Sequence, residues 1–157
     1  MVDNVFGGGD TRNSKKGTIT AKQFKVIMIG ESMVGKTSLI QRFVEGQFHT
    51  GNAPTLAWDF KVKTMQVENP DDPDIKDIVR LYVWDTAGQE RFRHIARMYY
   101  KDVCGVLICF DLTDEDSFKN LSFWITDLKT HAPESIAKVL IGNKADLCAE
   151  DPSARKV

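Results

Sequence analysis

The sequence predicts an α/β protein in which a mostly parallel sheet, with one antiparallel edge strand, lies between layers of helices. Three observations support this prediction. An apolar segment at residues 24–29 leads through a glycine-containing loop into an amphipathic helix. Two further apolar segments, at 103–110 and 139–141, flank a second helical pattern. Residues 58–67 alternate polar with apolar, and after an acidic turn residues 78–84 return as their hairpin partner. Strands that alternate with helices are typical of a parallel sheet.

The loop after the first strand, Gly30-Glu31-Ser32-Met33-Val34-Gly35-Lys36-Thr37, fits the phosphate-binding pattern G-x-x-x-x-G-K-[ST]. Glycines allow successive backbone N–H groups to surround a phosphate, and the following helix directs its positive end at the same anion. Lys36 is expected to reach the β- and γ-phosphates, and the Thr37 hydroxyl to bind Mg²⁺. The loop alone does not identify the nucleotide.

Composition sets broader bounds. The chain of 157 residues suits one domain, and 42% hydrophobic with 27% charged residues is typical of a soluble globular protein. A net charge of −1 provides no basic field for nucleic acid. Residues 1–22 are expected to be a flexible leader, and 23–157 the folded domain. The sequence shows no signal peptide or membrane span, and Cys104 and Cys109 are interpreted as buried, reduced thiols.

Two positions outside the loop are candidates for a metal site. Thr55 closes a polar loop beside the expected phosphate site, so its hydroxyl could bind a metal ion. Asp85 ends a buried strand; alone it would be read as a turn residue, but with a phosphate loop in the same chain it is placed to hold Mg²⁺ through water. Beyond it, the backbone N–H of Gly88 could approach a γ-phosphate, and Gln89 could orient an attacking water.

The segment Gly142-Asn143-Lys144-Ala145-Asp146 indicates which base is bound. A carboxylate such as Asp146 accepts two hydrogen bonds from the N1–H and N2–H₂ groups of guanine, whereas adenine lacks this donor pair. Asn143 can contact the base and brace the loop, and the aliphatic part of Lys144 can cover the base plane. Guanine is therefore favoured over adenine.

The helical pattern after residues 103–110 is interpreted as packing and not as a cofactor site. Thr113 is the expected helix cap, and acidic residues follow in the first turn. The expected core stripe consists of Phe118, Leu121, Trp124, Ile125 and Leu128.

With these motifs in order, the chain resembles the Ras-like small GTPases. Gly30–Thr37, Thr55, Asp85–Gln89 and Asn143–Asp146 are similar to four of that family's five nucleotide-binding motifs. Other stretches resemble those that mark the Rab family. They are Asp59-Phe60-Lys61-Val62-Lys63-Thr64, Trp84-Asp85-Thr86-Ala87-Gly88-Gln89-Glu90-Arg91-Phe92-Arg93, Met98-Tyr99-Tyr100 and Phe110-Asp111-Leu112-Thr113.

The resemblance implies a three-layer P-loop NTPase fold that binds GTP or GDP with Mg²⁺ and hydrolyses GTP slowly, as a molecular switch in vesicle trafficking. It places the catalytic role at Gln89 and the metal ligands at Thr37, Thr55 and Asp85. Phe48 falls where the family stacks an aromatic ring on guanine. The implied nucleotide contacts are Gly30, Ser32, Val34, Gly35, Lys36, Thr37, Ser38, Phe48, Thr55, Gly88, Asn143, Lys144 and Asp146.

The implied partners are a GTPase-activating protein, an exchange factor and effectors. They would meet Thr55–Phe60, Trp84 and Gly88–Tyr99, including the aromatic triad Phe60, Trp84 and Tyr99. Ala57 and Trp58 depart from the small residues usual in Rab proteins, which bears on effector identity. The implied location is the cytoplasm, with peripheral association with intracellular membranes in a full-length form.

Only eleven residues follow Asp146. The fifth motif, the C-terminal helix, the last strand and the prenylated cysteines of the Rab family are therefore expected to be missing. This leaves an alternative from another class: a non-catalytic form that binds Rab partners with little or no nucleotide binding. A third hypothesis is an ATPase or kinase, which Asp146 disfavours.

Overall fold

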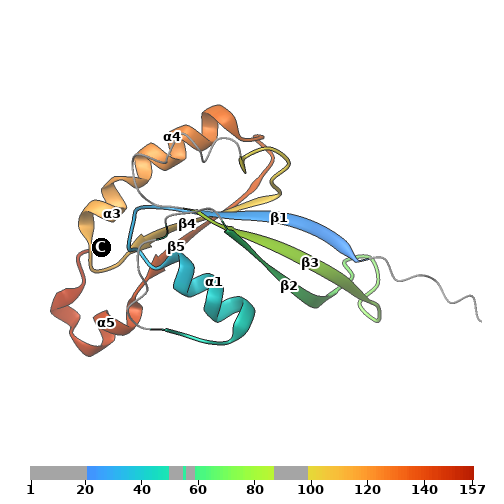
Figure 1. Ribbon diagram of the computed structural model, residues 1–157, viewed down its shortest axis with the longest axis horizontal. Coiled ribbons are helices and arrows are strands. Elements are labelled where there is room, and N and C mark those ends of the chain that lie inside the picture. Colours follow the sequence, from blue (N-terminus) through green and yellow to red (C-terminus); the bar gives the residue numbers. More distant parts are fainter. Residues whose placement is uncertain (1–20, 50–54, 56–58, 87–98) are drawn as a thin grey trace, which may run out of the picture.

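The computed structural model describes residues 21–49, 55, 59–86 and 99–157. These residues form a five-stranded sheet in the order β2-β3-β1-β4-β5, in which only the edge pair β2–β3 is antiparallel (Figure 1). This confirms the predicted α/β class and the antiparallel edge strand. The strands are β1 Lys22–Ile29, β2 Asp59–Glu68, β3 Lys76–Asp85, β4 Gly105–Asp111 and β5 Ala137–Asn143.

Helices lie on both sides of the sheet, with α1 on one side and α3 and α4 on the other (Figure 1). The helices are α1 Lys36–Glu45, α3 Glu115–Lys119, α4 Leu121–His131 and α5 Ala145–Glu150, followed by a 3₁₀ turn at Pro152–Ala154. None of the helices in the described ranges is long and apolar enough to cross a membrane.

The central strand β1 is buried on both faces because its alternate side chains enter two different cores. Ile27 and Ile29 pack with the α4 side of the sheet, where Trp124 and Leu128 are fully buried. Met28 packs on the α1 side with residues that include Val34, Ile40 and Val83. Each fully buried side chain of this size contributes about 1.5–3 kcal/mol. The apolar run of the first strand therefore reflects burial on two sides.

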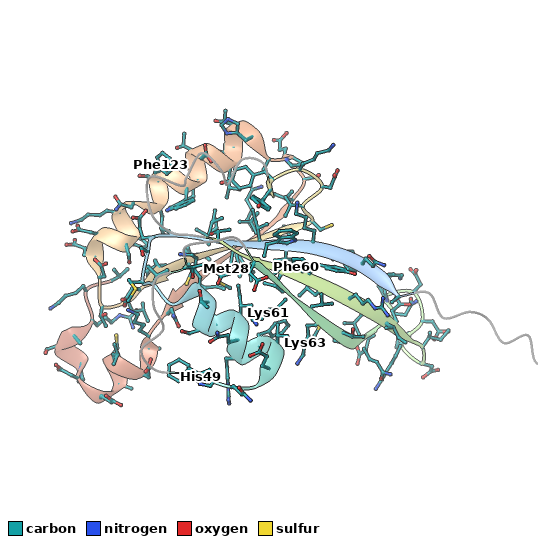
Figure 2. All side chains as sticks on the ribbon, in the orientation of Figure 1. Met28, His49, Phe60, Lys61, Lys63 and Phe123 are labelled. Carbon is teal, nitrogen blue, oxygen red and sulfur yellow. The ribbon has the colours of Figure 1, made fainter. Side chains whose placement is uncertain are left out.

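Figure 2 shows the same division in β2, where Phe60 lies on the α4 side of the sheet while Lys61 and Lys63 lie on the α1 side. The ammonium group of Lys63 lies 5.7 Å from the ring centroid of Phe43 in α1. Successive residues of a strand point to opposite faces, so this alternation follows from the polar–apolar pattern in the sequence.

The helical region after β4 differs from the prediction in three ways. The N-cap is Asp114 and not Thr113, because the Asp114 carboxylate accepts hydrogen bonds from the backbone N–H groups of Asp116 and Ser117, at 3.0 and 3.4 Å. A turn at Asn120 divides the helix, so Phe118 belongs to α3 and is 42% exposed, although its ring contacts Phe110. Ile125 is 37% exposed, because Leu121, Trp124 and Leu128 form the buried stripe of α4.

One of the two thiols predicted to be buried is exposed. Cys104 precedes β4 and is exposed, whereas Cys109 lies within the strand and is fully buried. Burial raises the pKa of the Cys109 thiol to about 11. The apolar run at 103–110 forms the predicted strand, but the strand begins only at Gly105.

Candidate functional site

The site lies where the carboxyl ends of the parallel strands meet, which is where α/β sheets bind ligands. Gly30 follows β1, while Asp85, Asp111 and Asn143 are the last residues of β3, β4 and β5. These positions are far apart in the sequence and become neighbours only because the strands are parallel and in register.

The loop between β1 and α1 requires both of its glycines for steric reasons. Gly30 has a φ of 140°, and a Cβ at this position would lie 2.1 Å from the backbone oxygen of Cys109 in β4. Gly35 has a φ of 93°, and a Cβ there would lie 2.3 Å from Nδ2 of Asn143. The motif therefore matches the backbone geometry that its pattern predicts, and the loop is enclosed by β4 and by the residue that ends β5.

Lys36, at the start of α1, is buried inside this loop with 5% of its surface exposed. Its ammonium group donates hydrogen bonds to the backbone oxygens of Gly30, at 3.0 Å, and Glu31, at 2.6 Å. Burial lowers the pKa of Lys36 to about 8, against an opposing effect of the Asp85 carboxylate. Because this pKa still lies above 7, the amine is mostly protonated at neutral pH. It lies at the position where the motif predicts a phosphate ligand.

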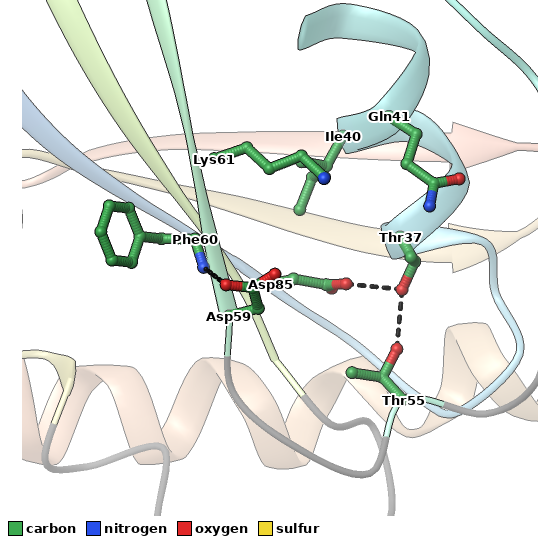
Figure 3. A pocket seen from close by; sticks show the side chains of 8 residues that line it. All are labelled: Thr37, Ile40, Gln41, Thr55, Asp59, Phe60, Lys61 and Asp85. Atoms are coloured by element: carbon green, nitrogen blue, oxygen red, sulfur yellow. Dashed lines mark hydrogen bonds between the residues drawn. The ribbon is translucent and has the colours of Figure 1, made fainter. Parts of the chain in front are cut away.

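Three side-chain oxygens predicted as metal ligands, from Thr37, Thr55 and Asp85, meet at the start of α1 (Figure 3). The Thr37 hydroxyl donates to Oδ2 of Asp85 at 2.5 Å, and its oxygen lies 2.7 Å from the Thr55 hydroxyl oxygen. Burial raises the pKa of Asp85, and the hydrogen bond from Thr37 opposes this shift. Among the residues that the structure describes, Oδ1 of Asp85 is the one buried side-chain polar atom without a hydrogen-bond partner.

These residues border a cavity of about 170 Å³. Its remaining lining residues are Ile40, Gln41, Asp59, Phe60 and Lys61. Mg²⁺ takes oxygen ligands and commonly uses one or two carboxylates together with substrate phosphates. Two hydroxyls and one carboxylate, of which one oxygen is unpaired, fit this requirement beside the cavity.

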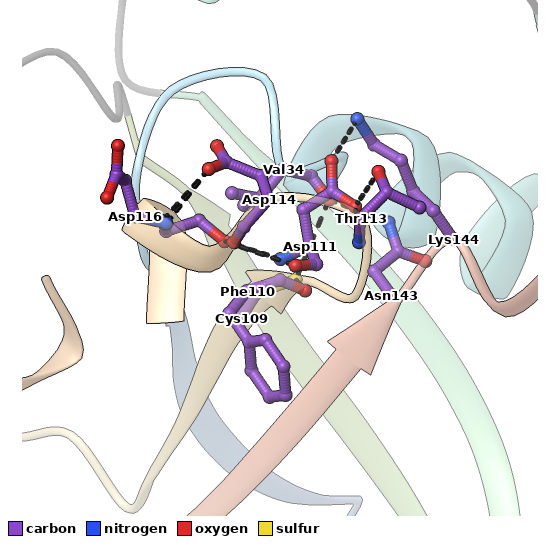
Figure 4. A network of polar contacts seen from close by, with 10 residues as sticks. Val34, Cys109, Phe110, Asp111, Thr113, Asp114, Asp116, Asn143 and Lys144 are labelled. Atoms are coloured by element: carbon purple, nitrogen blue, oxygen red, sulfur yellow. Dashed lines mark hydrogen bonds and ion pairs between the residues drawn. The ribbon is translucent and has the colours of Figure 1, made fainter. Parts of the chain in front are cut away.

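The residues that end β4 and β5 form a second polar network (Figure 4). Nδ2 of Asn143 donates to the backbone oxygen of Val34 at 2.7 Å, which ties β5 to the phosphate loop. The Lys144 ammonium lies 2.6 Å from Oδ2 of Asp111. Burial raises the pKa of Asp111, but hydrogen bonds from Lys144 and Thr113 outweigh it and hold the pKa below its ordinary value. Asn143 thus braces the loop, as the sequence suggested.

Of the four residues predicted to contact the base, Asn143 and Lys144 are half-buried, whereas Asp146 and Phe48 are exposed. Asp146 lies in the first turn of α5, a helix with no buried residue, and Phe48 is 61% exposed beyond the end of α1. Ser32 and Ser38 are half-buried in the loop and in α1. Gly88 and Gln89 lie outside the described residues, as do residues 56–58 and 88–98 of the predicted partner surface.

The predicted aromatic triad is brought together on the α4 side of β2 and β3. The ring centroids of Phe60 and Trp84 are 4.8 Å apart, and those of Trp84 and Tyr99 are 5.0 Å apart. Tyr82 extends the group, with its ring centroid 6.0 Å from that of Phe60, and the Lys25 ammonium lies 5.5 Å from the Trp84 ring.

The sequence analysis did not predict two contacts of the site. Asp111 pairs with Lys144, and its signal was available, because it ends an apolar strand just as Asp85 does. The other is a hydrogen bond from the Trp124 indole to the Glu31 carboxylate, at 2.9 Å. No spacing rule relates these two residues, which lie 93 positions apart.

Comparison with known proteins agrees with this geometry. The model of the Ras family matches residues 25–157. The chain is 42% identical over 133 residues to the Ras-related protein RAB1BV of Beta vulgaris, which covers 85% of this chain and 57% of that protein. It is also 42% identical over 123 residues to the Ras-related protein Rab-15 of Homo sapiens, covering 78% of this chain and 55% of that protein.

Similarity to plant relatives is of the same order, with 41% identity over 133 residues to the Ras-related protein RABE1e of Arabidopsis thaliana. The chain spans about half the length of the curated relatives it matches, between 55% and 57% in these three cases. Its phosphate loop, its sheet order and these similarities lead to one conclusion: the chain belongs to the Ras family and is a Rab-like small GTPase within it.

Proposed function

We propose that this chain binds GTP and GDP with Mg²⁺, hydrolyses GTP slowly, and acts as a molecular switch in membrane trafficking. The observation that carries the proposal is the meeting of Thr37, Thr55 and Asp85 beside the buried amine of Lys36, with one Asp85 oxygen left unpaired. Oxygen ligands next to a cationic phosphate cradle are what a nucleotide–Mg²⁺ complex requires.

Each residue has a distinct role in this proposal. Lys36 holds the β- and γ-phosphates as a point charge, within a loop whose glycines allow backbone N–H groups to approach the phosphates. Thr37, Thr55 and Asp85 would hold Mg²⁺, which when bound neutralises charge on the phosphate oxygens. Gln89 orients the attacking water, and the N–H of Gly88 donates to the γ-phosphate. Thr55 would be released with the γ-phosphate, which makes its loop the switch.

Selection of guanine is assigned to the segment after β5. Asp146 accepts the N1–H and N2–H₂ groups of guanine, Phe48 stacks on the base, and the stem of Lys144 covers its other side. Asn143 links this segment to the phosphate loop through the Val34 oxygen. An adenine nucleotide would leave the Asp146 carboxylate without a donor pair.

The aromatic triad is the proposed contact surface for effectors. Residues 55–60 and 88–99 are proposed to contact an activating protein and an exchange factor. The stacked rings of Phe60, Trp84 and Tyr99 support this assignment, since aromatic clusters commonly anchor interfaces. A full-length form would work in the cytoplasm and associate peripherally with membranes.

One observation favours the alternative of a partner-binding form with weak nucleotide binding. Asp146 is exposed and α5 buries none of its residues, so the base side of the site is open. The alternative and the main proposal differ in whether the chain retains GDP.

Titration of the chain with fluorescent GDP and ATP analogues, with and without Mg²⁺, tests the proposal. We expect tight GDP binding that weakens when Mg²⁺ is removed, and a preference for GDP over ATP. Asp146→Asn should shift the preference toward xanthine nucleotides, whose base has an acceptor in place of the N2–H₂ group. Glu150→Gln, an exposed change in the same helix, should leave it unaltered. An ATP preference, or no GDP binding, would overturn the proposal.

A further inference from the structure

The hydrogen bond between Trp124 and Glu31 connects the core of the protein to the phosphate loop. Trp124 has no exposed surface and packs in the α4 side of the core with Ile27 and Ile29. Its indole Nε1 donates to Oε1 of Glu31 at 2.9 Å. The side chain of a loop residue is therefore held by a donor that the core keeps in place.

Glu31 also contacts the phosphate-binding lysine through its backbone. The backbone oxygen of Glu31 accepts a hydrogen bond from the Lys36 ammonium at 2.6 Å. A single residue thus joins α4, through its carboxylate, to Lys36, through its carbonyl. A displacement of Glu31 would move one of the two acceptors that position the amine, the other being Gly30.

The charge of Glu31 makes its orientation important. A carboxylate in a loop that receives phosphate groups repels them, and this repulsion depends on distance and on solvent exposure. The indole N–H of Trp124 draws the carboxylate toward α4, and a hydrogen bond to an ionised acceptor is stronger than one between neutral groups. The contact therefore both anchors the loop and directs a negative charge toward the helix.

We propose that Trp124 and Glu31 are positioning residues that hold the phosphate loop in its binding conformation and thereby slow the release of the nucleoside diphosphate, GDP. This inference rests on the proposed function, since it assigns a role within the same guanine nucleotide site. Neither residue is catalytic, because each acts through the loop and through Lys36.

Dissociation rates of a fluorescent GDP analogue in Mg²⁺, chased with excess unlabelled GDP, test the inference. W124F keeps an aromatic ring and removes the donor, and E31A removes the acceptor. We expect each to speed dissociation by about 5- to 20-fold, the range for loss of a charge-assisted hydrogen bond that is partly transmitted to the ligand. E31Q keeps an acceptor oxygen and should stay within about threefold of the wild-type rate.

Two further variants separate positioning from packing. The double variant W124F/E31A should dissociate no faster than the faster single variant, because both changes remove the same interaction. Phe123→Leu alters the neighbouring ring, which is 40% exposed and meets Trp124 edge-on, and should leave the dissociation rate within about twofold, as expected for a site outside the loop. A purely structural role would lower the unfolding temperature of W124F and leave dissociation from E31A at the wild-type rate.

The outcomes distinguish this inference from the function on which it rests. A wild-type chain that retains GDP, together with E31A and E31Q that dissociate at the same rate, would overturn the positioning role and leave the proposed function standing. A wild-type chain that does not bind GDP would overturn the proposed function and, with it, this role. Because Glu31 is a half-buried loop residue, the comparison of E31A with E31Q remains decisive even if W124F fails to fold.

Discussion

The phosphate side and the base side of the site are built differently. On the phosphate side, Val34 and Lys36 are 1% and 5% exposed, and the loop is bound by β4, β5 and α4. On the base side, Asp146 and Leu147 are exposed and α5 contributes no buried residue. The neighbouring strands repeat the contrast, since β4 is almost wholly buried and β5 is mostly exposed.

This difference shows that the proposed phosphate cradle is part of the core, whereas the proposed base-binding segment lies on its surface. A cradle already formed without ligand pays little ordering cost when the ligand binds. Changes in the cradle should therefore affect the stability of the empty protein, and changes at the base side should affect ligand choice alone. Four predictions test this contrast, in order of decreasing effect.

Gly30→Ala should cause the largest loss. The new Cβ would lie 2.1 Å from the Cys109 backbone oxygen, at a φ of 140° that alanine rarely adopts, and neither strand can move without breaking the sheet. We expect a loss of about 3 kcal/mol or more in the free energy of unfolding, measured by urea denaturation. Gly46→Ala is the matched control, because Gly46 has a φ of 72° but a Cβ there would have no atom within 4 Å. We expect this variant to lose about 1 kcal/mol in the free energy of unfolding. Equal losses would refute the steric explanation.

Asn143→Ala should destabilise the ligand-free protein, because the buried Val34 carbonyl loses its donor at 2.7 Å. We expect a loss of about 1–2 kcal/mol in the free energy of unfolding. Asp146→Ala, three residues later and exposed, should change it by less than about 0.5 kcal/mol. A similar loss in both variants would remove the distinction between the two sides.

GDP affinity should fall as the pH rises above about 8, where Lys36 loses its proton in the empty protein. Between this value and the ordinary lysine pKa of 10.5, the unfolded chain binds more protons than the folded one, so the empty protein gains stability with pH from this group. Phosphate binding requires the cation, so affinity should decrease by up to about tenfold per pH unit. Titrations at pH 7, 8 and 9 measure this effect. Lys36→Arg stays charged and should show no such decrease.

Met33→Gly should produce the smallest effect, a gain in stability. Met33 has a φ of 64° and is 60% exposed, so it occupies a left-handed conformation without compensating burial. Relief of this strain, less the added entropy of the unfolded chain, should raise the free energy of unfolding by about 0.5 kcal/mol. Met33→Ala keeps the Cβ and should give no gain. Thermal unfolding of both variants decides the matter.

Much of the fold was predictable because buried strands leave apolar runs in the sequence. The segment at 24–29 proved to be part of β1 Lys22–Ile29, and 78–84 part of β3 Lys76–Asp85. The phosphate loop was predictable for a different reason, since its backbone conformation needs glycine at fixed positions. Asp85 lies beside Thr37 because parallel β1 and β3 end at the same edge of the sheet, where α1 begins. Thr55 precedes the antiparallel strand β2, and its hydroxyl reaches Thr37 from that side.

The rest depended on tertiary contacts that no local pattern records. Phe118 and Ile125 fit a helical stripe, but the turn at Asn120 and the packing of α4 leave them exposed. The bond from Trp124 to Glu31 depends on where α4 lies over the sheet, and periodicity identified Trp124 only as a core residue. Glu31 occupies a variable position of the motif, so the pattern gave its side chain no role.

The central position of β1 also has a consequence for the newly made chain. Its parallel partners β3 and β4 are synthesised later, and Gly30 closes against Cys109, which a ribosome adding roughly 5–20 residues per second reaches several seconds afterwards. Until β3 has been made, the apolar segment Val26-Ile27-Met28-Ile29 has no sheet to join. The phosphate loop leaves the ribosome before β3 and β4, yet it is enclosed only after most of the sheet has been made.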